Sequence, residues 1–288
     1  MEEYIFKKEY FGRNYTFMQV RIEQIPDATY IKKNGIDGVI VITDTPNEVV
    51  SNIKNISTLQ ELRGLDLNSY TYKDLNDLLC LRKLEYLRME EKCESNIPFS
   101  SLSMLQCVYL NYNKKNCASI FECKQLENIF IDNYSETSST AFSTFKNAKR
   151  IGLIKSKITE FEAIHNLHQL EHLGIGYNSK MESISWLRNN NSLTSLGFQN
   201  CKKIKDWEEI GSLGKIEKII LENCGEIPSL SFLQNISSLK DLRIIGSTSI
   251  GDGKIKELMH LPNLKHIFVP IKKEYDITLD ELTAYNNN

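Results

Sequence analysis

The sequence predicts an α/β solenoid, a single coil of short repeats that lays about ten parallel strands side by side in one concave sheet. The first observation behind this is a triplet spacing of apolar residues between positions 158 and 250. The pattern restarts every 23 residues, at Ile158, Met181, Ile204, Ile227 and Ile250. An α-helix has a period of about 3.6 residues and a strand of about 2, so neither produces it; a coil with one strand per turn does.

The second observation is a motif of the form L-x-x-L-x-x-L-x-L that recurs ten times. Its third apolar position is occupied by Leu65, Leu87, Val108, Ile129, Ile151, Leu173, Leu196, Ile219, Leu242 and Ile267. Successive copies are 21 to 25 residues apart, which is too short for a strand, a full helix and two turns. We therefore expect 3₁₀ turns opposite the strands, with longer helical pieces only at 254–260 and 74–81.

The regions outside the repeats predict caps. Residues 1–58 form the expected N-terminal cap: a hairpin of 4–10 and 15–22 around a Gly-Arg-Asn turn at 12–14, a short helical link at 27–34 and a strand at 38–42. The repeats occupy 59–269. Residues 270–288 form a C-terminal cap and tail, in which a capping box at 278–281 opens a short helix and 286–288 are disordered.

The composition of the chain argues against nucleic-acid binding, secretion and a membrane span. The chain is 41% hydrophobic and 25% charged with a net charge of −2, so it lacks the basic excess expected for binding nucleic acid. The N-terminus begins with acids, and no apolar run is long enough for a secretory signal or a membrane span. Seven cysteines without a Cys-x-x-Cys pair indicate reduced thiols and a cytoplasmic location.

The ten copies resemble leucine-rich repeats of the short, internalin-like or phosphatase-regulator-like class, over about residues 59 to 269. The family's buried Asn/Cys position holds Asn113, Ser156, Asn178, Cys201, Cys224 and Ser247, and the sequence departs from it at Tyr70, Lys92, Tyr134 and Lys272. In that family this side chain bonds backbone groups where the chain leaves the strand. The resemblance implies the fold and says little about function.

Residues between the strand leucines are expected to point outward. Aromatic residues beside arginine are common in binding hot spots, and cross-strand packing of aromatics is the alternative. On the first interpretation the predicted partner-binding residues are Tyr86, Arg88, Glu90, Tyr109, Asn111, Tyr112, Phe130, Asp132, Arg150, Gly152, Gly174 and Tyr177.

Four glycines recur on adjacent predicted strands, at Gly152, Gly174, Gly176 and Gly197. They indicate either close approach of a partner or crowding within the array, and the sequence does not decide between the two.

No catalytic, cofactor or metal site is predicted, because the chain has no phosphate loop, H-E-x-x-H motif or nucleophile elbow. His165, His168 and His172 are expected to be separate surface histidines. Cys107 is expected to face outward without an activating base.

The function expected is a non-enzymatic module that binds a folded protein and is a monomer when free. A chain rich in Ile, Asn and Lys without a signal looks like an intracellular bacterial protein. Small bacterial repeat proteins of this kind resemble immunity proteins, which implies that the partner is a toxin, and acidic residues beside the aromatics favour a basic toxin domain. The alternative is an intracellular regulatory adaptor or a repeat-containing secreted effector.

Overall fold

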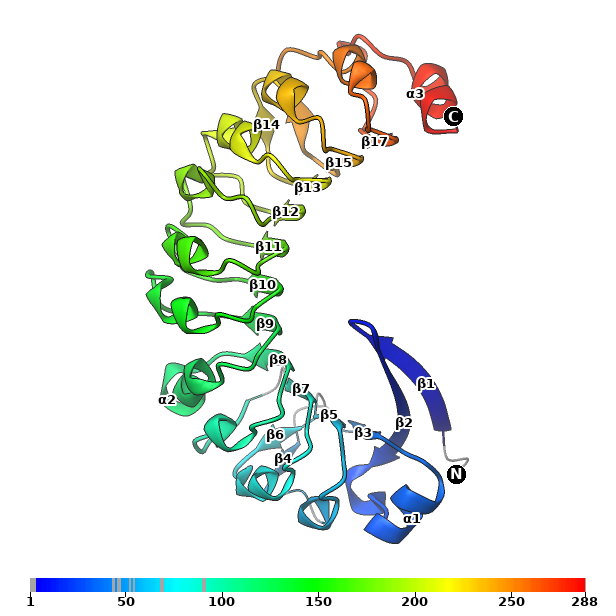
Figure 1. Cartoon of the computed structure of the whole chain (residues 1–288), viewed down its shortest axis with the longest axis vertical. Helices are drawn as coiled ribbons and strands as arrows, with labels where there is room; N and C mark the ends of the chain where they lie inside the picture. The colour runs from blue at the N-terminus through cyan, green and yellow to red at the C-terminus, as the bar shows by residue number, and fades with distance from the viewer. Residues whose placement is uncertain are drawn as a thin grey trace. The chain divides into compact units, whose positions relative to one another are not determined.

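A computed structural model describes residues 4–42, 45, 48–51, 53, 55–67, 70–89 and 92–287. The chain divides into two compact units, Met1–Asp132 (unit 1) and Asn133–Asn288 (unit 2). In each unit a repeat contributes one strand on one side and a 3₁₀ turn on the other (Figure 1). Each unit is described by itself.

Unit 1 contains a sheet in the order β1-β2-β3-β5-β7-β8-β9. Its strands are β1 (Tyr4–Tyr10), β2 (Arg13–Arg21), β3 (Gly38–Ile42), β5 (Gly64–Asp66), β7 (Tyr86–Met89), β8 (Cys107–Asn111) and β9 (Asn128–Asp132), with β4 (Val49–Val50) and β6 (Thr71–Tyr72) forming a small second sheet. The helices are α1 (Ala28–Lys33), α2 (Lys114–Cys117), η1 (Ile22–Gln24), η2 (Ile56–Thr58), η3 (Asn76–Cys80), η4 (Phe99–Ser101) and η5 (Ala118–Glu122).

The predicted N-terminal hairpin is confirmed, with a different turn. Tyr10 pairs with Arg13, so the loop consists of Phe11 and Gly12, both with positive φ (50° and 79°), as in a type I′ turn. The predicted turn at 12–14 is therefore displaced. The rest of the region follows the prediction, since β2 leads through α1 to β3 in parallel pairing, and Asp27 caps α1 by accepting from Tyr30 N.

Unit 2 contains a parallel sheet in the order β10-β11-β12-β13-β15-β17. Its strands are β10 (Arg150–Ile154), β11 (His172–Gly176), β12 (Ser195–Gln199), β13 (Lys218–Glu222), β15 (Asp241–Ile245) and β17 (His266–Phe268), with β14 (Glu226–Ile227) pairing β16 (Ser249–Ile250). The helices are η6 (Thr140–Thr144), η7 (Glu162–Asn166), η8 (Ser185–Leu187), η9 (Trp207–Ser212), η10 (Ser231–Asn235), η11 (Lys256–His260) and α3 (Leu279–Asn286).

All ten predicted repeat strands are present, four in unit 1 and six in unit 2. In unit 1, the sheet also includes β1, β2 and β3, which precede the first repeat strand in the strand order. The repeat leucines form the core, with Leu65, Leu173 and Leu196 each no more than 2% exposed. The 3₁₀ turns opposite the strands are confirmed. The longer helical pieces expected at 74–81 and 254–260 are wrong, because η3 and η11 are five-residue 3₁₀ turns like several others.

The capping box of α3 is confirmed, since Thr278 and Glu281 bond reciprocally across the first turn. The expectation of a disordered tail is wrong for Asn286, which ends α3 and bonds β17 through its side chain. Asn288 lies outside the described residues. The division into cap, repeats and C-terminal segment at residues 58 and 269 stays a prediction.

Candidate functional site

Most of the predicted aromatic patch does come together, on β7, β8 and β9 of unit 1. Arg88, Tyr109 and Phe130 occupy one row across these strands. The rings of Tyr109 and Phe130 stack with centroids 4.3 Å apart, and Tyr86 lies 6.1 Å from Tyr109. The residues between the strand leucines therefore align across these three strands, as the repeat spacing predicts.

The predicted exposure of this patch is wrong at Tyr86, which is 1% exposed. The hairpin of the same chain covers it: Tyr10 stacks on Tyr86 with centroids 4.3 Å apart, and Phe17 meets the same ring edge-on at 6.0 Å. At the hairpin tip, Phe11 stacks on Phe130 at 5.6 Å. The apolar face of an amphipathic hairpin must be buried somewhere, and here it is buried on the strand face of unit 1.

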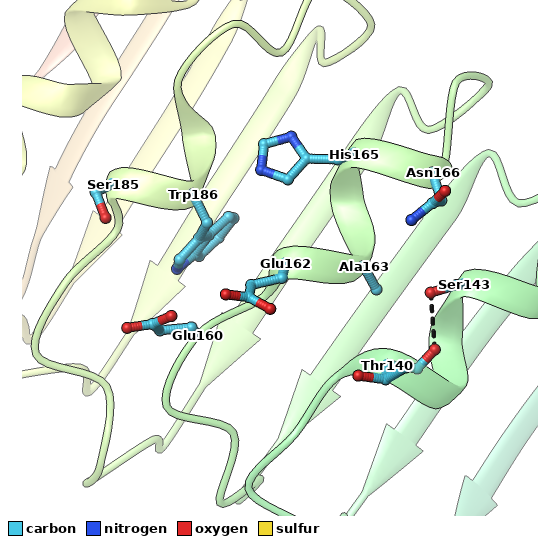
Figure 2. Close-up of a pocket in the computed structure, with 9 residues that line it drawn as sticks. All are labelled: Thr140, Ser143, Glu160, Glu162, Ala163, His165, Asn166, Ser185 and Trp186. Carbon is cyan, nitrogen blue, oxygen red and sulfur yellow. Dashed lines mark hydrogen bonds between the residues drawn. The ribbon is translucent and has the colours of Figure 1, made fainter.

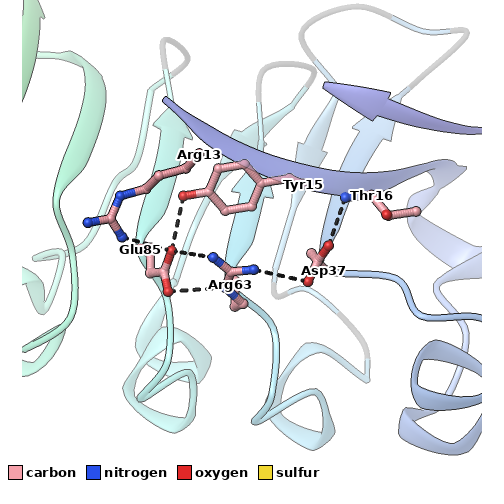
Figure 3. Close-up of polar contacts among 6 residues, drawn as sticks. All are labelled: Arg13, Tyr15, Thr16, Asp37, Arg63 and Glu85. Atoms are coloured by element: carbon pink, nitrogen blue, oxygen red, sulfur yellow. Dashed lines mark hydrogen bonds and ion pairs between the residues drawn. The ribbon is translucent and has the colours of Figure 1, made fainter. Parts of the chain in front are cut away.

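The hairpin is also held by a polar clasp, drawn in Figure 3. Glu85 accepts hydrogen bonds from Tyr15 Oη (3.1 Å), Arg13 (3.2 Å) and Arg63 (2.9 and 3.1 Å). Arg63 also pairs with Asp37 at 3.2 Å, and Asp37 accepts from the backbone N of the residue after Tyr15 at 2.8 Å. Asp37, Arg63 and Glu85 each immediately precede a strand, so the register aligns them.

Burial and charge shape the titration of this clasp. Burial raises the pKa of Glu85, but hydrogen bonds and attraction from Arg63 outweigh it, so the net pKa is lowered. Burial first, and then the negative charge of Glu85, raises the pKa of Tyr15. Glu85 therefore stays ionised and Tyr15 stays a hydrogen-bond donor at neutral pH.

The other predicted residues of unit 1 are partly engaged. Arg88 pairs with buried Asp66 at 3.7 Å and lies 5.8 Å from the ring of Tyr109. Tyr112 is buried against Phe121 rather than available to a partner.

Three further positions of unit 1 were part of the prediction. Asn111 and Asp132 are half-buried, and Glu90 lies outside the described residues. Cys107, expected to be outward-facing, is buried beneath the hairpin with Tyr15 and Phe17.

The strand face of unit 2 carries the remaining predicted residues and a shallow recess. Gly152, Gly174 and Gly197 are aligned on β10, β11 and β12 by the strand register. Together with Ile154 and Ile220 they line a mainly apolar recess with a volume of about 240 Å³. Arg150 is half-buried at the start of β10 in the same face.

The fold does not require glycine at two of these positions. A Cβ atom added at Gly174 would meet no heavy atom within 4 Å, and one added at Gly197 would lie 4.0 Å from Ile220. At Gly176 the nearest atom, in Gln199, would be 3.5 Å away, which is ordinary contact. Crowding within the array therefore does not explain Gly174 or Gly197.

Tyr177 directly follows β11 and is 48% exposed. Its φ of 54° lies in the left-handed region, which an L-residue with a Cβ adopts at a cost. The residue that follows each neighbouring strand adopts the same conformation, and these residues are Asn133, Lys155, Asn200, Asn223 and Gly246. Three of these five are asparagine and one is glycine, the residue types that tolerate it best. Tyr177, like Lys155, is therefore a residue type that this conformation does not favour.

The polar ladder behind the strands is present in unit 2. Asn178 is fully buried, donates to Ile158 O (2.8 Å) and accepts from two backbone N–H groups. Cys201 and Cys224 each donate to a carbonyl at 3.4 Å. These side chains satisfy backbone groups that leave the strand ladder.

Two ladder assignments were wrong. The buried position of the last repeat is Thr248, which donates to Leu221 O at 3.1 Å, while Ser247 is exposed. In unit 1, Asn113 is exposed and caps α2. The buried ladder residue of that repeat is Asn116, whose side-chain amide donates to Cys93 O.

Comparison with solved structures agrees with this architecture. An internalin, InlF, from Listeria monocytogenes matches with a TM-score of 0.55 at 17% identity, covering 85% of this chain and 84% of that one. A leucine-rich repeat protein of Leptospira interrogans, LIC12759, matches with a TM-score of 0.51 at 17% identity, covering 91% and 79%. The chain has the leucine-rich repeat fold.

A third match is the plant peptide hormone receptor RGFR1, solved in complex with RGF2. Its TM-score is 0.50 at 19% identity, and the match covers 80% of this chain but 39% of the receptor. No family model and no curated relative matches the sequence.

Two of the three predicted surface histidines of this leucine-rich repeat chain, His165 and His172, lie on different elements. His165 lines a polar recess of about 450 Å³ on the 3₁₀ side of unit 2, beside Glu162 and Trp186 (Figure 2), whereas His172 lies on β11. Burial lowers the pKa of His172, and nearby Arg150 adds to the effect. Within the described ranges, no group of three or more His, Cys, Asp or Glu residues is arranged to hold a metal ion.

Burial makes three of the thiols poor nucleophiles. Burial raises the pKa of Cys117 to about 11 and those of Cys123 and Cys201 to about 12, so the nucleophilic thiolate is scarce at neutral pH. Of the helices in the part of the chain that the structure describes, none has the length and apolarity needed to cross a bilayer.

Proposed function

We propose that the chain is a non-enzymatic protein-binding module whose partner docks on the strand face of unit 2, over the glycine recess. The observation that carries this proposal is the open space above Gly174 and Gly197. No residue in the described part of the chain fills that space, and no close contact there requires either glycine. Glycine in a strand lowers the stability of the fold relative to a larger residue. A partner side chain that binds in the recess would explain why glycine is present there.

Unit 1 supplies an internal example of what such glycines accommodate. Gly38 and Gly64 are neighbours on β3 and β5, and the ring of Phe17 lies where their side chains would be, 2.3 and 2.7 Å from the added Cβ atoms. An aromatic ring from the hairpin thus occupies the space that these glycines leave. We expect a partner side chain of similar size to occupy the recess of unit 2.

Exposed apolar side chains on the same face support a protein partner. Ile154, Ile245 and Phe268 are each at least 37% exposed on the strand face, and Tyr177 is exposed beside it. Arg243 lies 5.1 Å from the ring of Phe268. Aromatic, aliphatic and arginine side chains are the usual anchors of protein interfaces, and Tyr177 places a large ring at a turn position where asparagine or glycine would cost less.

Of the predicted partner-binding residues, we therefore propose that those of unit 2 form the centre of the interface: Arg150, Gly152, Gly174 and Tyr177. The hairpin of unit 1 occupies much of the face that Tyr86, Tyr109 and Phe130 provide. The fold shared with a receptor solved in complex with RGF2 is consistent with binding a protein or peptide.

Immunity against a bacterial toxin, in the cytoplasm, is the specific role we propose within this function, with a regulatory adaptor or secreted effector as the alternative. Of the acids predicted beside the aromatic residues, Asp132 is half-buried and Glu90 lies outside the described residues, so a basic toxin domain as the partner rests on the sequence pattern alone. The strand face of unit 2 holds three bases and two acids, namely Arg150, Lys218, Arg243, Glu222 and Asp241. Its charge does not favour a basic partner.

The test fills the recess without disturbing the fold. Gly174→Leu has room for its side chain and should reduce partner capture from a lysate of the source organism by about tenfold or more. Gly214→Leu is the matched control, because a Cβ at Gly214 also meets nothing within 4 Å and the residue lies in a turn before β13. Equal capture by both variants and the wild type would remove the recess from the interface.

A further inference from the structure

We propose that the outer edge of β1 is a second docking site, which accepts an extended acidic segment of another protein as an added antiparallel strand. In the part of the chain that the structure describes, β1 pairs with β2 alone and begins the strand order of unit 1. Its seven residues are mostly exposed, with Tyr4 62% and Ile5 39% exposed.

The hairpin turn determines which backbone groups this edge offers. In a two-residue hairpin the residues flanking the loop, here Tyr10 and Arg13, exchange both main-chain hydrogen bonds, and the pattern then alternates along the strands. The backbone groups of Phe6 and Lys8 therefore also point to β2. Those of Ile5, Lys7 and Glu9 point outward and are available to a further strand.

The terminal strand of unit 2 shows how this chain protects an edge. β17 has three residues, and the side chain of Asn286 accepts from Ile267 N and donates to Ile267 O, both at 2.9 Å. One amide thus replaces the bonds that an added strand would make. Proteins commonly shorten or cover their edges in this way, whereas β1 is long and has no such cover among the described residues.

The charge of the β1 edge selects the occupant. Lys7 and Lys8 outnumber Glu9, and Lys8 Nζ lies 4.5 Å from the centre of the Tyr10 ring. In the symmetric register centred on the strand, a second copy would place Lys7 opposite Lys7, which is unfavourable. Carboxylates opposite Lys7 and Lys8, with β-branched residues opposite Ile5 and Phe6, complement this edge.

Amide hydrogen exchange of the full chain tests the geometry first. The amides of Ile5, Lys7 and Glu9 should exchange at least about tenfold faster than those of Phe6, Lys8 and Tyr10, because only the second set is bonded to β2. Equal protection of both sets would mean that the edge is already covered, and this result would overturn the proposal.

The second step adds a defined probe, the blocked peptide Thr-Thr-Glu-Glu-Val-Val-Thr, which runs antiparallel to β1 with its two acids opposite Lys8 and Lys7. It should protect the amides of Ile5, Lys7 and Glu9, and bind at least about tenfold more tightly than the same peptide with Lys-Lys at its centre. Equal binding of the two peptides, or protection elsewhere, contradicts the assigned occupant.

Two variants separate the edge from its charge. Lys7→Pro removes an outward N–H and no bond to β2, so it should abolish peptide binding while the urea midpoint stays near that of the wild type. Lys7→Glu keeps the N–H but leaves one base and one acid opposite the two central peptide residues, so it should remove the preference for the Glu-Glu peptide. If Lys7→Pro unfolds the hairpin, the Lys7→Glu result decides, and an unchanged preference there would refute the proposal.

Discussion

A Cβ atom added at Gly38 in unit 1 would lie 2.3 Å from the ring of Phe17, whereas one added at Gly174 in unit 2 would meet no heavy atom within 4 Å. Both glycines lie on a strand of a main sheet, and only the first has a neighbour that requires it. In unit 1 the aromatic ring that uses the space comes from the same chain. In unit 2 no described residue supplies one, which is the physical basis for assigning that space to a partner.

The same contrast applies to the aromatic residues. Tyr86, Tyr109 and Phe130 have the composition of an interface, and that interface is formed with the hairpin of their own chain. Residue type on a strand face therefore indicates that something binds there, without saying whether the partner is internal. The two units show both outcomes in one molecule.

The largest expected effect comes from removing the ring that fills unit 1. Phe17 is fully buried, so Phe17→Ala should lower the free energy of unfolding by about 3–5 kcal/mol through the cavity it leaves. Tyr4→Ala, on the same hairpin but exposed, should change it by less than about 0.5 kcal/mol. Urea unfolding compares the two, and similar small losses would mean that the hairpin is not packed as described.

A pair of glycine substitutions tests the comparison directly. Gly38→Ala must displace Phe17 and should destabilise by about 1–3 kcal/mol. Gly174→Ala meets open space and should be neutral or stabilise by up to about 1 kcal/mol, because alanine restricts the unfolded chain. If the two changes have the same sign in urea unfolding, the contrast between the glycines does not hold.

Periodicity was sufficient to predict the repeats because each one is a local pattern. The inward position of Leu65 or Leu196 follows from spacing alone, and so does the column that aligns Gly152 with Gly174. The capping box at Thr278 is equally local, since its two partners are three residues apart. These features were read correctly from the sequence.

The candidate site could be predicted only in part from the sequence, because the contacts that define it join segments far apart in the chain. The stacking of Tyr10 on Tyr86 joins positions 76 residues apart, and no spacing rule relates them. A usable signal did exist: Tyr15 and Phe17 alternate on β2 and require a face to bury them. The use of Thr248 in place of Ser247 depends on one extra residue after β15, which a repeat of fixed length does not reveal.

The clasp around Glu85 makes the covered face of unit 1 sensitive to pH. The pKa of Glu85 is lower in the folded chain than its ordinary value of 4.5, so the unfolded chain takes up the proton first. The stabilisation is complete above the ordinary pKa and is lost as pH falls through the folded value. Glu85→Gln should cost about 1.5 kcal/mol at pH 7, as expected for hydrogen bonds to a charged group.

The difference between wild type and Glu85→Gln should then shrink on acidification. Urea unfolding at a series of pH values measures it, with Glu61→Gln as the control, since Glu61 is exposed and its ion pair with Lys83 is at the surface. A difference that stays constant down to pH 3 would show that the charge of Glu85 does not hold the hairpin.

The smallest expected effect concerns Tyr177, where stability and binding should move in opposite directions. Asparagine tolerates the left-handed conformation better than tyrosine, so Tyr177→Asn should stabilise the chain by about 0.5–1 kcal/mol and weaken partner capture. Asn200→Tyr places the same ring at the equivalent position after β12, where φ is also 54°, and should cost a similar amount of stability. Urea unfolding and the capture assay measure the two effects. If Tyr177→Asn loses stability, the ring contributes to the fold. If it gains stability and capture is undiminished, Tyr177 has no role in binding.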